Sequence, residues 1–91
     1  MDREKLKQQL DQAQENVGRS IRLVVDQWNL IASLERKRWD TADARRILNL
    51  LEESRDLHIA ERDRLLHMLG VYFPEDPARV EGPSASEDGT P

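Results

Sequence analysis

The segment that decides the fold spans residues 34–48 and reads LERKRWDTADARRIL. It holds the end of one helix and the start of the next. Three basic residues at 36–38 suit a last helical turn, where carbonyl groups without partners carry partial negative charge. Asp40 is a favoured N-cap residue, because its carboxylate accepts a hydrogen bond from the free N–H groups of a first turn. Trp39, just before this cap, is predicted to fold over Ala44 as a hydrophobic staple.

The stretch before this segment has the apolar period of an α-helix. It contains no proline, and its apolar residues recur at steps of three or four, which is one face of a helix. These residues are Leu6, Leu10, Ala13, Val17, Ile21, Val24, Trp28, Ile31 and Leu34. The pattern predicts a first helix over about 2–38. Gly18 is the expected place of a bend or a close backbone contact, because glycine weakens a helix interior by about 1 kcal/mol.

The stretch after Asp40 predicts a second helix over about 41–69. Gly70 follows at the position where many helices end on glycine. The main apolar face of this helix comprises Ala44, Ile47, Leu48, Leu51, His58, Leu65, Met68 and Leu69. Because only a few residues separate the two helices, they are predicted to be antiparallel neighbours in an all-α, coiled-coil-like hairpin.

Folding the chain about this connector predicts which residues meet along the seam. The expected pairs are Leu34 with Ile47 and Leu48, Ile31 with Leu51, Val24 with His58, Val17 with Leu65, and Ala13 with Leu69. In this register the first helix extends past the second, so Leu6 and Leu10 are left uncovered. Residues 71–73 are expected to double back onto them.

Residues 74–91 differ in composition from the rest of the chain. They are rich in Pro, Gly, Ser and acidic residues, which bury too little apolar surface to become ordered. We therefore expect one helical-hairpin domain over residues 1–73 and a disordered acidic tail over residues 74–91. The net charge of −4 arises in this tail, because basic and acidic residues balance over residues 1–69.

Composition narrows the classes of function. Charged residues make up 35% of the chain and aromatic residues 4%, a profile that fits long solvated helices better than a sheet. The chain has no cysteine, which excludes disulfides and thiolate metal sites. The N-terminal residues MDREKLKQQLDQ lack the apolar segment of a signal peptide, and no apolar run is long enough to span a membrane. These features predict a cytoplasmic protein without a membrane partner.

Apolar residues are more numerous than one seam between two helices can cover. Those that lie off the predicted seam are Val25, Leu30, Leu50, Leu57 and Ile59. Burying a Leu or Ile side chain is worth about 1.5–3 kcal/mol, so these residues favour association with another chain. We expect a homodimer in which two hairpins form an antiparallel four-helix bundle. The alternative is that some of these side chains are simply exposed.

Residue types used in catalysis are present without a catalytic arrangement. Asp56 lies on a different helical face from Ser54 and His58, and no glycine-rich turn supplies an oxyanion hole or a phosphate cradle. Asp63 and His67 are one turn apart, but an exposed polar pair explains them better than a metal site. We expect no enzyme activity, no cofactor, no metal and no small-molecule substrate.

His58 differs from the other polar residues because it falls on the predicted core face. A core histidine hydrogen-bonded to a neighbour is the simplest interpretation. The alternative is a pH-sensitive or register-fixing polar contact across a dimer.

The tip of the hairpin gathers basic residues next to an aromatic one. Arg38, Arg45 and Arg46 lie near Trp39, interspersed with acidic residues. A solvated tip that compensates the helix dipoles is the simplest interpretation. If Trp39 is exposed, the tip becomes a candidate contact site, because Trp and Arg are typical of binding hot spots.

Residues 34–66 carry a motif that resembles a known group of proteins. Its elements are Leu34-Glu35-Arg36, Asp40-Thr41, Ala44-Arg45, Glu52-Glu53-Ser54, Leu57-His58 and Arg62-Asp63-Arg64-Leu65. This pattern is similar to that of short, uncharacterised bacterial helical-hairpin proteins. The connector of such proteins commonly contains a glycine, where this chain has Arg38 and Trp39. The resemblance implies a helical hairpin and transfers no activity, ligand or catalytic residue.

Taken together, these patterns predict a non-enzymatic protein–protein interaction, structural or regulatory module. Its expected partners are a second copy of itself and another protein. The candidate contact residues are Arg38, Trp39, Arg45, Arg46, Leu50 and Leu57. The alternative is a nucleic-acid-associated regulator that uses the basic tip, although the balanced charge of residues 1–69 gives no general reason to expect nucleic acid. A third possibility is an assembly gated by protonation of His58.

Overall fold

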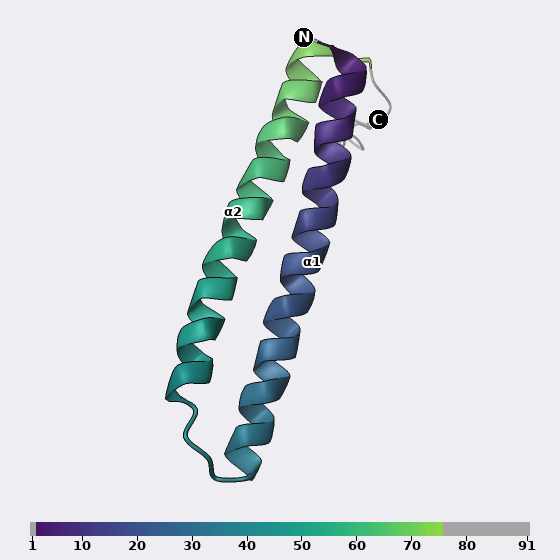
Figure 1. Cartoon of the computed structure of the whole chain (residues 1–91). Coiled ribbons are helices and arrows are strands. Elements are labelled where there is room, and N and C mark those ends of the chain that lie inside the picture. Colours follow the sequence, from purple (N-terminus) through teal and green to yellow (C-terminus); the bar gives the residue numbers. More distant parts are fainter. Residues whose placement is uncertain (1, 76–91) are drawn as a thin grey trace, which may run out of the picture.

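The computed structural model describes residues 2–75 and is all-α. Helix α1 (Arg3–Arg36) and helix α2 (Ala42–Tyr72) lie side by side and run in opposite directions, as Figure 1 shows. The predicted antiparallel hairpin is therefore confirmed. Within the predicted tail, Pro74 and Glu75 form an exposed turn. Residues 76–91, which hold the rest of that tail, lie outside the described residues.

Helix α1 ends at Arg36, earlier than the predicted end near residue 38. The chain leaves the helix through a pair of hydrogen bonds typical of a Schellman motif. The N–H of Arg38 donates to the carbonyl of Glu35 (3.0 Å), and the N–H of Trp39 donates to the carbonyl of Leu34 (2.9 Å). Arg38 adopts a φ of 60°, a left-handed conformation that usually falls to glycine. This reversal of backbone handedness is the reason that the helix stops.

The two helices start differently. The Asp2 carboxylate caps α1 by accepting a hydrogen bond from the N–H of Glu4 at 3.0 Å. In α2 the N-cap residue is Thr41, whose side chain makes no capping bond, so the prediction of Asp40 as N-cap was wrong by one residue. Asp40 still has the expected chemical role, because its carboxylate accepts a hydrogen bond from the N–H of Ala42 at 3.0 Å.

Helix α2 continues through Gly70 and ends at Tyr72, three residues beyond the predicted end. The N–H of Phe73 closes the last turn on the carbonyl of Leu69 at 2.8 Å. Proline disfavours helical backbone in the residue before it, and Phe73, which precedes Pro74, has already left the helical region at φ −136° and ψ 67°. Proline rather than glycine therefore ends the helix.

The seam of α1 repeats every seven residues, in steps of three and four. It comprises Leu6, Leu10, Ala13, Val17, Ser20, Val24, Gln27, Ile31 and Leu34. Ser20 is buried and Gln27 half-buried, whereas Ile21 and Trp28 are 44% and 49% exposed. The placement of Ile21 and Trp28 in the seam was therefore wrong. A seven-residue period keeps one face toward a partner helix, and two successive steps of four would have rotated the seam away.

Two hydrophobic clusters hold the hairpin together. The cluster at the terminal end is built by Leu6, Leu10, Ala13, Leu65 and Leu69, with Leu66, Met68 and Phe73 packed against it. The cluster near the tip is built by Val24, Ile31, Ala44 and Leu48, with Leu34 and Leu51 packed against it. Leu6 and Leu10 are thus covered by α2 itself. Helix α2 is longer than predicted, and its residues lie closer to the start of α1 than in the predicted register. Phe73 reaches this cluster as expected, but Val71 and Tyr72 remain exposed.

The middle of the seam is polar on α2. Its seven-residue repeat runs through Ala44, Leu48, Leu51, Arg55, His58, Arg62, Leu65 and Leu69. Arg55, His58 and Arg62 are half-buried. The two arginines pair with the neighbouring Asp56 (3.1 Å) and Asp63 (2.9 Å) of the same helix. The two apolar clusters are therefore separated by a polar layer.

Helix α1 runs through Gly18 without interruption. A methyl group added at this glycine would meet only the tip of the Arg22 side chain, at an ordinary contact distance of 3.7 Å. The expectation of a close backbone contact at Gly18 was therefore wrong.

Candidate interaction surfaces

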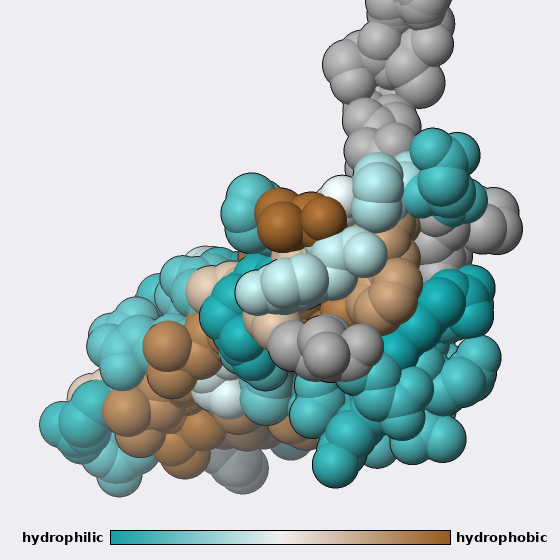
Figure 2. Space-filling model, turned by 90° about the horizontal axis from the view of Figure 1, so that it is seen from above, coloured by the Kyte–Doolittle hydropathy of each residue, from teal (hydrophilic) through white to brown (hydrophobic). Residues whose placement is uncertain are grey.

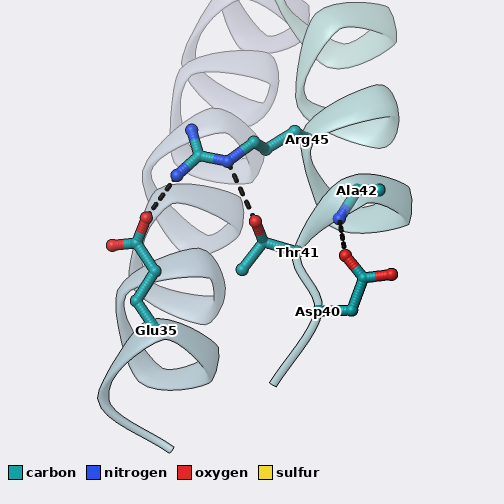
Figure 3. A network of polar contacts seen from close by, with 5 residues as sticks. All are labelled: Glu35, Asp40, Thr41, Ala42 and Arg45. Atoms are coloured by element: carbon teal, nitrogen blue, oxygen red, sulfur yellow. Dashed lines mark hydrogen bonds and ion pairs between the residues drawn. The ribbon is translucent and has the colours of Figure 1, made fainter. Parts of the chain in front are cut away.

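At the tip, one arginine ties the end of α1 to the start of α2. The guanidinium of Arg45 donates from Nε to the Thr41 hydroxyl at 3.0 Å and pairs through a terminal nitrogen with the Glu35 carboxylate. Figure 3 shows Arg45 lying between these two groups, with the Asp40 turn beside it. Both charged side chains are about half exposed, and exposed ion pairs contribute at most about 1 kcal/mol. Arg45 thus orients the connector more than it stabilises the fold.

The remaining tip residues divide into paired and unpaired groups. Arg46 pairs with Asp43 in the first turn of α2. Arg38 forms no ion pair within residues 2–75. Trp39 is 60% exposed, and the Lys37 ammonium lies 4.8 Å from the centre of its ring. Trp39 does not join the cluster around Ala44, so the predicted staple was wrong.

His58 lies in the polar layer of the seam. It is half-buried and makes no hydrogen bond within the part of the chain that the structure describes. Its seam neighbours on α2 are Arg55 and Arg62, one turn to either side. His58 thus has half-buried arginines as its neighbours along α2, and within residues 2–75 it lacks the hydrogen bond expected of a core histidine.

Two sides of the hairpin flank the seam, and each is identified by a contact that spans both helices. On one side, a shallow hollow is lined by residues that include Gln9 and Asn16 of α1 and Glu61 and Arg64 of α2. On the other side, α1 and α2 are joined by the Glu35–Arg45 ion pair. Residues spaced by seven along one helix form a row that stays on the same side of a heptad seam. An exposed residue therefore lies on the side of the contact whose residues share its row.

The first side carries an apolar surface that we call the leucine face. Positions 23 and 30 continue the row of Gln9 and Asn16, position 47 continues the row of Glu61, and positions 50 and 57 continue the row of Arg64. The leucine face consists of Leu23, Leu30, Ile47, Leu50 and Leu57, which are 46%, 47%, 48%, 63% and 72% exposed. The assignment of Ile47 to the seam was therefore wrong.

The second side carries a narrower apolar surface that we call the tryptophan face. Ile21 and Trp28 continue the row of Glu35 along α1, and Val25 lies one turn from both. All three belong to α1. On α2 the same side shows Ile59 and Leu66, which are half-buried beside the seam.

Figure 2, which looks along the hairpin from the end where α1 begins and α2 ends, shows apolar side chains gathered along one side of the molecule and bordered by polar ones. Leu23 and Ile47 were not predicted to be among the apolar residues that lie off the seam. The signal that identifies them is the strict seven-residue spacing, which separates positions beside the seam from positions within it.

Three further observations bear on the class of site. Within residues 2–75, no group of three or more His, Cys, Asp or Glu side chains is arranged to hold a metal ion. In the same part of the chain, neither helix has an apolar stretch long enough to cross a membrane. No protein-family model, curated protein or solved structure matches this chain.

Proposed function

We propose that this chain is a protein–protein interaction module without catalytic chemistry, and that it works as a self-associating helical hairpin. The observation that carries the proposal is the leucine face, where five large apolar side chains are about half exposed or more. Contiguous apolar surface of this kind marks interaction sites on soluble proteins. The resemblance of residues 34–66 to short bacterial hairpin proteins belongs to this proposal and adds no activity to it.

The thin core supports self-association. A body of about 70 residues lies near the size at which one core supplies only a few kcal/mol of net stability. Here the core is further divided into two clusters by the polar layer around His58. Pairing of two hairpins into an antiparallel four-helix bundle would bury additional apolar surface.

The charges at the tip weigh against the nucleic-acid alternative. Binding to a phosphate backbone rests on cationic side chains that are free to replace counterions. Arg45 and Arg46 are each engaged with a carboxylate of this chain, Glu35 and Asp43 respectively. The same tip fits a protein partner better, because it presents the exposed ring of Trp39 beside Arg38.

The experiment is thermal unfolding followed by circular dichroism at protein concentrations from about 1 to 100 µM. If folding is linked to self-association, the Tm rises with concentration, because mass action favours the associated state. A Tm that is the same at every concentration would contradict the proposal. Repeating the series at high salt separates apolar association from charge-driven association, since only the second is screened.

A further inference from the structure

We propose that self-association uses the leucine face, and that the occupant of this face is the leucine face of a second copy, seated over the tip half of the hairpin. The inference rests on the proposed function and goes further by assigning one of two available surfaces. It also fixes how much of each hairpin the partner covers.

The rows that form the leucine face change character along the hairpin. Toward the tip they carry the five apolar residues of the face, and in the half nearer residue 3 they carry Gln9, Asn16, Glu61 and Arg64. Apolar residues return to these rows only at the end of α2, where Met68 is half-buried against the terminal cluster and Val71 is exposed. Glu61 and Arg64 satisfy one another in water at 2.7 Å, so burying them would remove solvent from a charged pair and gain no new contact. A partner that covers only the tip half buries the apolar residues and leaves this pair solvated.

The leucine face is favoured over the tryptophan face because both helices contribute to it. Leu23 and Leu30 come from α1, and the other three residues come from α2. The exposed apolar residues of the tryptophan face come from α1 alone, and the Glu35–Arg45 ion pair bounds that side at the tip. The two most exposed of the large apolar residues within residues 2–75, Leu50 at 63% and Leu57 at 72%, lie on the leucine face.

The width and area of the face point to a second copy as its occupant. A surface built by three rows on two helices, one row from α1 and two from α2, matches the width of another helical pair. The apolar part amounts to roughly 400 Å² per copy. A two-fold pair covers both copies at once, and with its polar rim it approaches the total of about 1,000 Å² that a specific interface needs.

The first test replaces the two most exposed leucines with charge and compares them with a matched pair on the other side. In sedimentation equilibrium, Leu50→Glu combined with Leu57→Glu should weaken self-association at least 100-fold. The control, Ile21→Glu combined with Val25→Glu, should leave the association constant within about threefold. The reverse order, with only the control pair dissociating, would overturn the face assignment while leaving the proposed function intact.

A second test does not depend on the charged variants remaining folded. Because the chain has no cysteine, a single engineered cysteine gives one label position per copy. Asp26 is exposed on the row of Gln12, at the rim of the leucine face, and Ala32 is exposed on the row of Val25. In pulsed EPR of spin-labelled chains, the distance between copies should be shorter for Asp26→Cys than for Ala32→Cys.

The outcomes separate the two claims. A longer distance for Asp26→Cys than for Ala32→Cys in an associated sample would overturn the leucine face as the interface. A native chain that stays monomeric, with no dipolar signal at either position, would refute the proposed self-association and the second-copy assignment together.

Discussion

Gln27 of α1 donates its side-chain amide to the main-chain oxygen of Ala44 on α2 at 2.9 Å. This carbonyl lies inside a helix, so its second lone pair is the one that accepts from Gln27. The bond crosses the seam beside the tip cluster and is formed in one register only. Together with Ser20, whose hydroxyl is satisfied by the carbonyl of Val17 at 2.8 Å, it explains how an otherwise apolar seam accommodates two polar residues.

Replacing Gln27 with alanine should therefore destabilise the hairpin. Loss of the cross-seam bond should lower the free energy of unfolding by about 0.5–1.5 kcal/mol, measured by urea denaturation. Gln8→Ala is the control, because Gln8 is exposed on the same helix and gains the same helix propensity. Equal free energies for the two variants would show that the bond contributes nothing.

Arg38→Gly should stabilise the protein. A left-handed backbone costs a non-glycine residue about 1–2 kcal/mol, and part of this is offset by the extra flexibility of glycine in the unfolded chain. The net gain should be about 1 kcal/mol, seen as a higher Tm. Arg36→Gly, inside the last turn of α1, should do the opposite. A lower Tm for Arg38→Gly would contradict the backbone conformation described for the connector.

Gly18→Ala should also raise stability. The added methyl group meets only the flexible end of Arg22 at 3.7 Å, so the helix-propensity gain of about 1 kcal/mol should appear almost in full. Chemical denaturation of the two proteins measures it directly. A loss of stability would mean that another chain packs closely against α1 at this position.

The Glu61–Arg64 pair predicts a pH dependence with a definite sign. A hydrogen bond from Arg64, followed by its positive charge, lowers the pKa of Glu61 below its usual 4.5. Because the folded-state pKa is depressed, the stabilising effect is complete above pH 4.5 and is lost as the pH falls through the folded value. Both groups are solvated, so the effect on stability is small and the NMR titration of Glu61 is the sensitive measurement. In Arg64→Leu the Glu61 pKa should return toward 4.5; an unchanged titration would refute the pairing.

The helices and their antiparallel packing follow from the sequence, because apolar spacing and the connector at residues 36–41 act locally. The exact seam does not follow, since apolar character favours Ile21 over the neighbouring Ser20. Ser20 is buried and Ile21 is exposed, because the seven-residue period of two wrapped helices places position 20 in the seam. The end of α2 was misplaced for a similar reason, because Gly70 permits a helix end without requiring one, whereas Pro74 enforces it.

The surface residues were predicted with mixed success. Leu50 and Leu57 are highly exposed, in agreement with their assignment off the seam. The pairing of Arg45 with Glu35 on the other helix depends on the register, which sequence periodicity alone does not fix. The placement of Leu23 and Ile47 on the leucine face depends on the same register, because the two residues come from different helices.

Sedimentation equilibrium of the full chain, with its helicity recorded at each concentration, tests the central claim most directly. If one hairpin leaves an apolar face that a second copy covers, the apparent mass should rise from 10.6 kDa toward twice that value between about 1 and 100 µM. A mass that remains at 10.6 kDa over this range, with both helices fully formed, would contradict it.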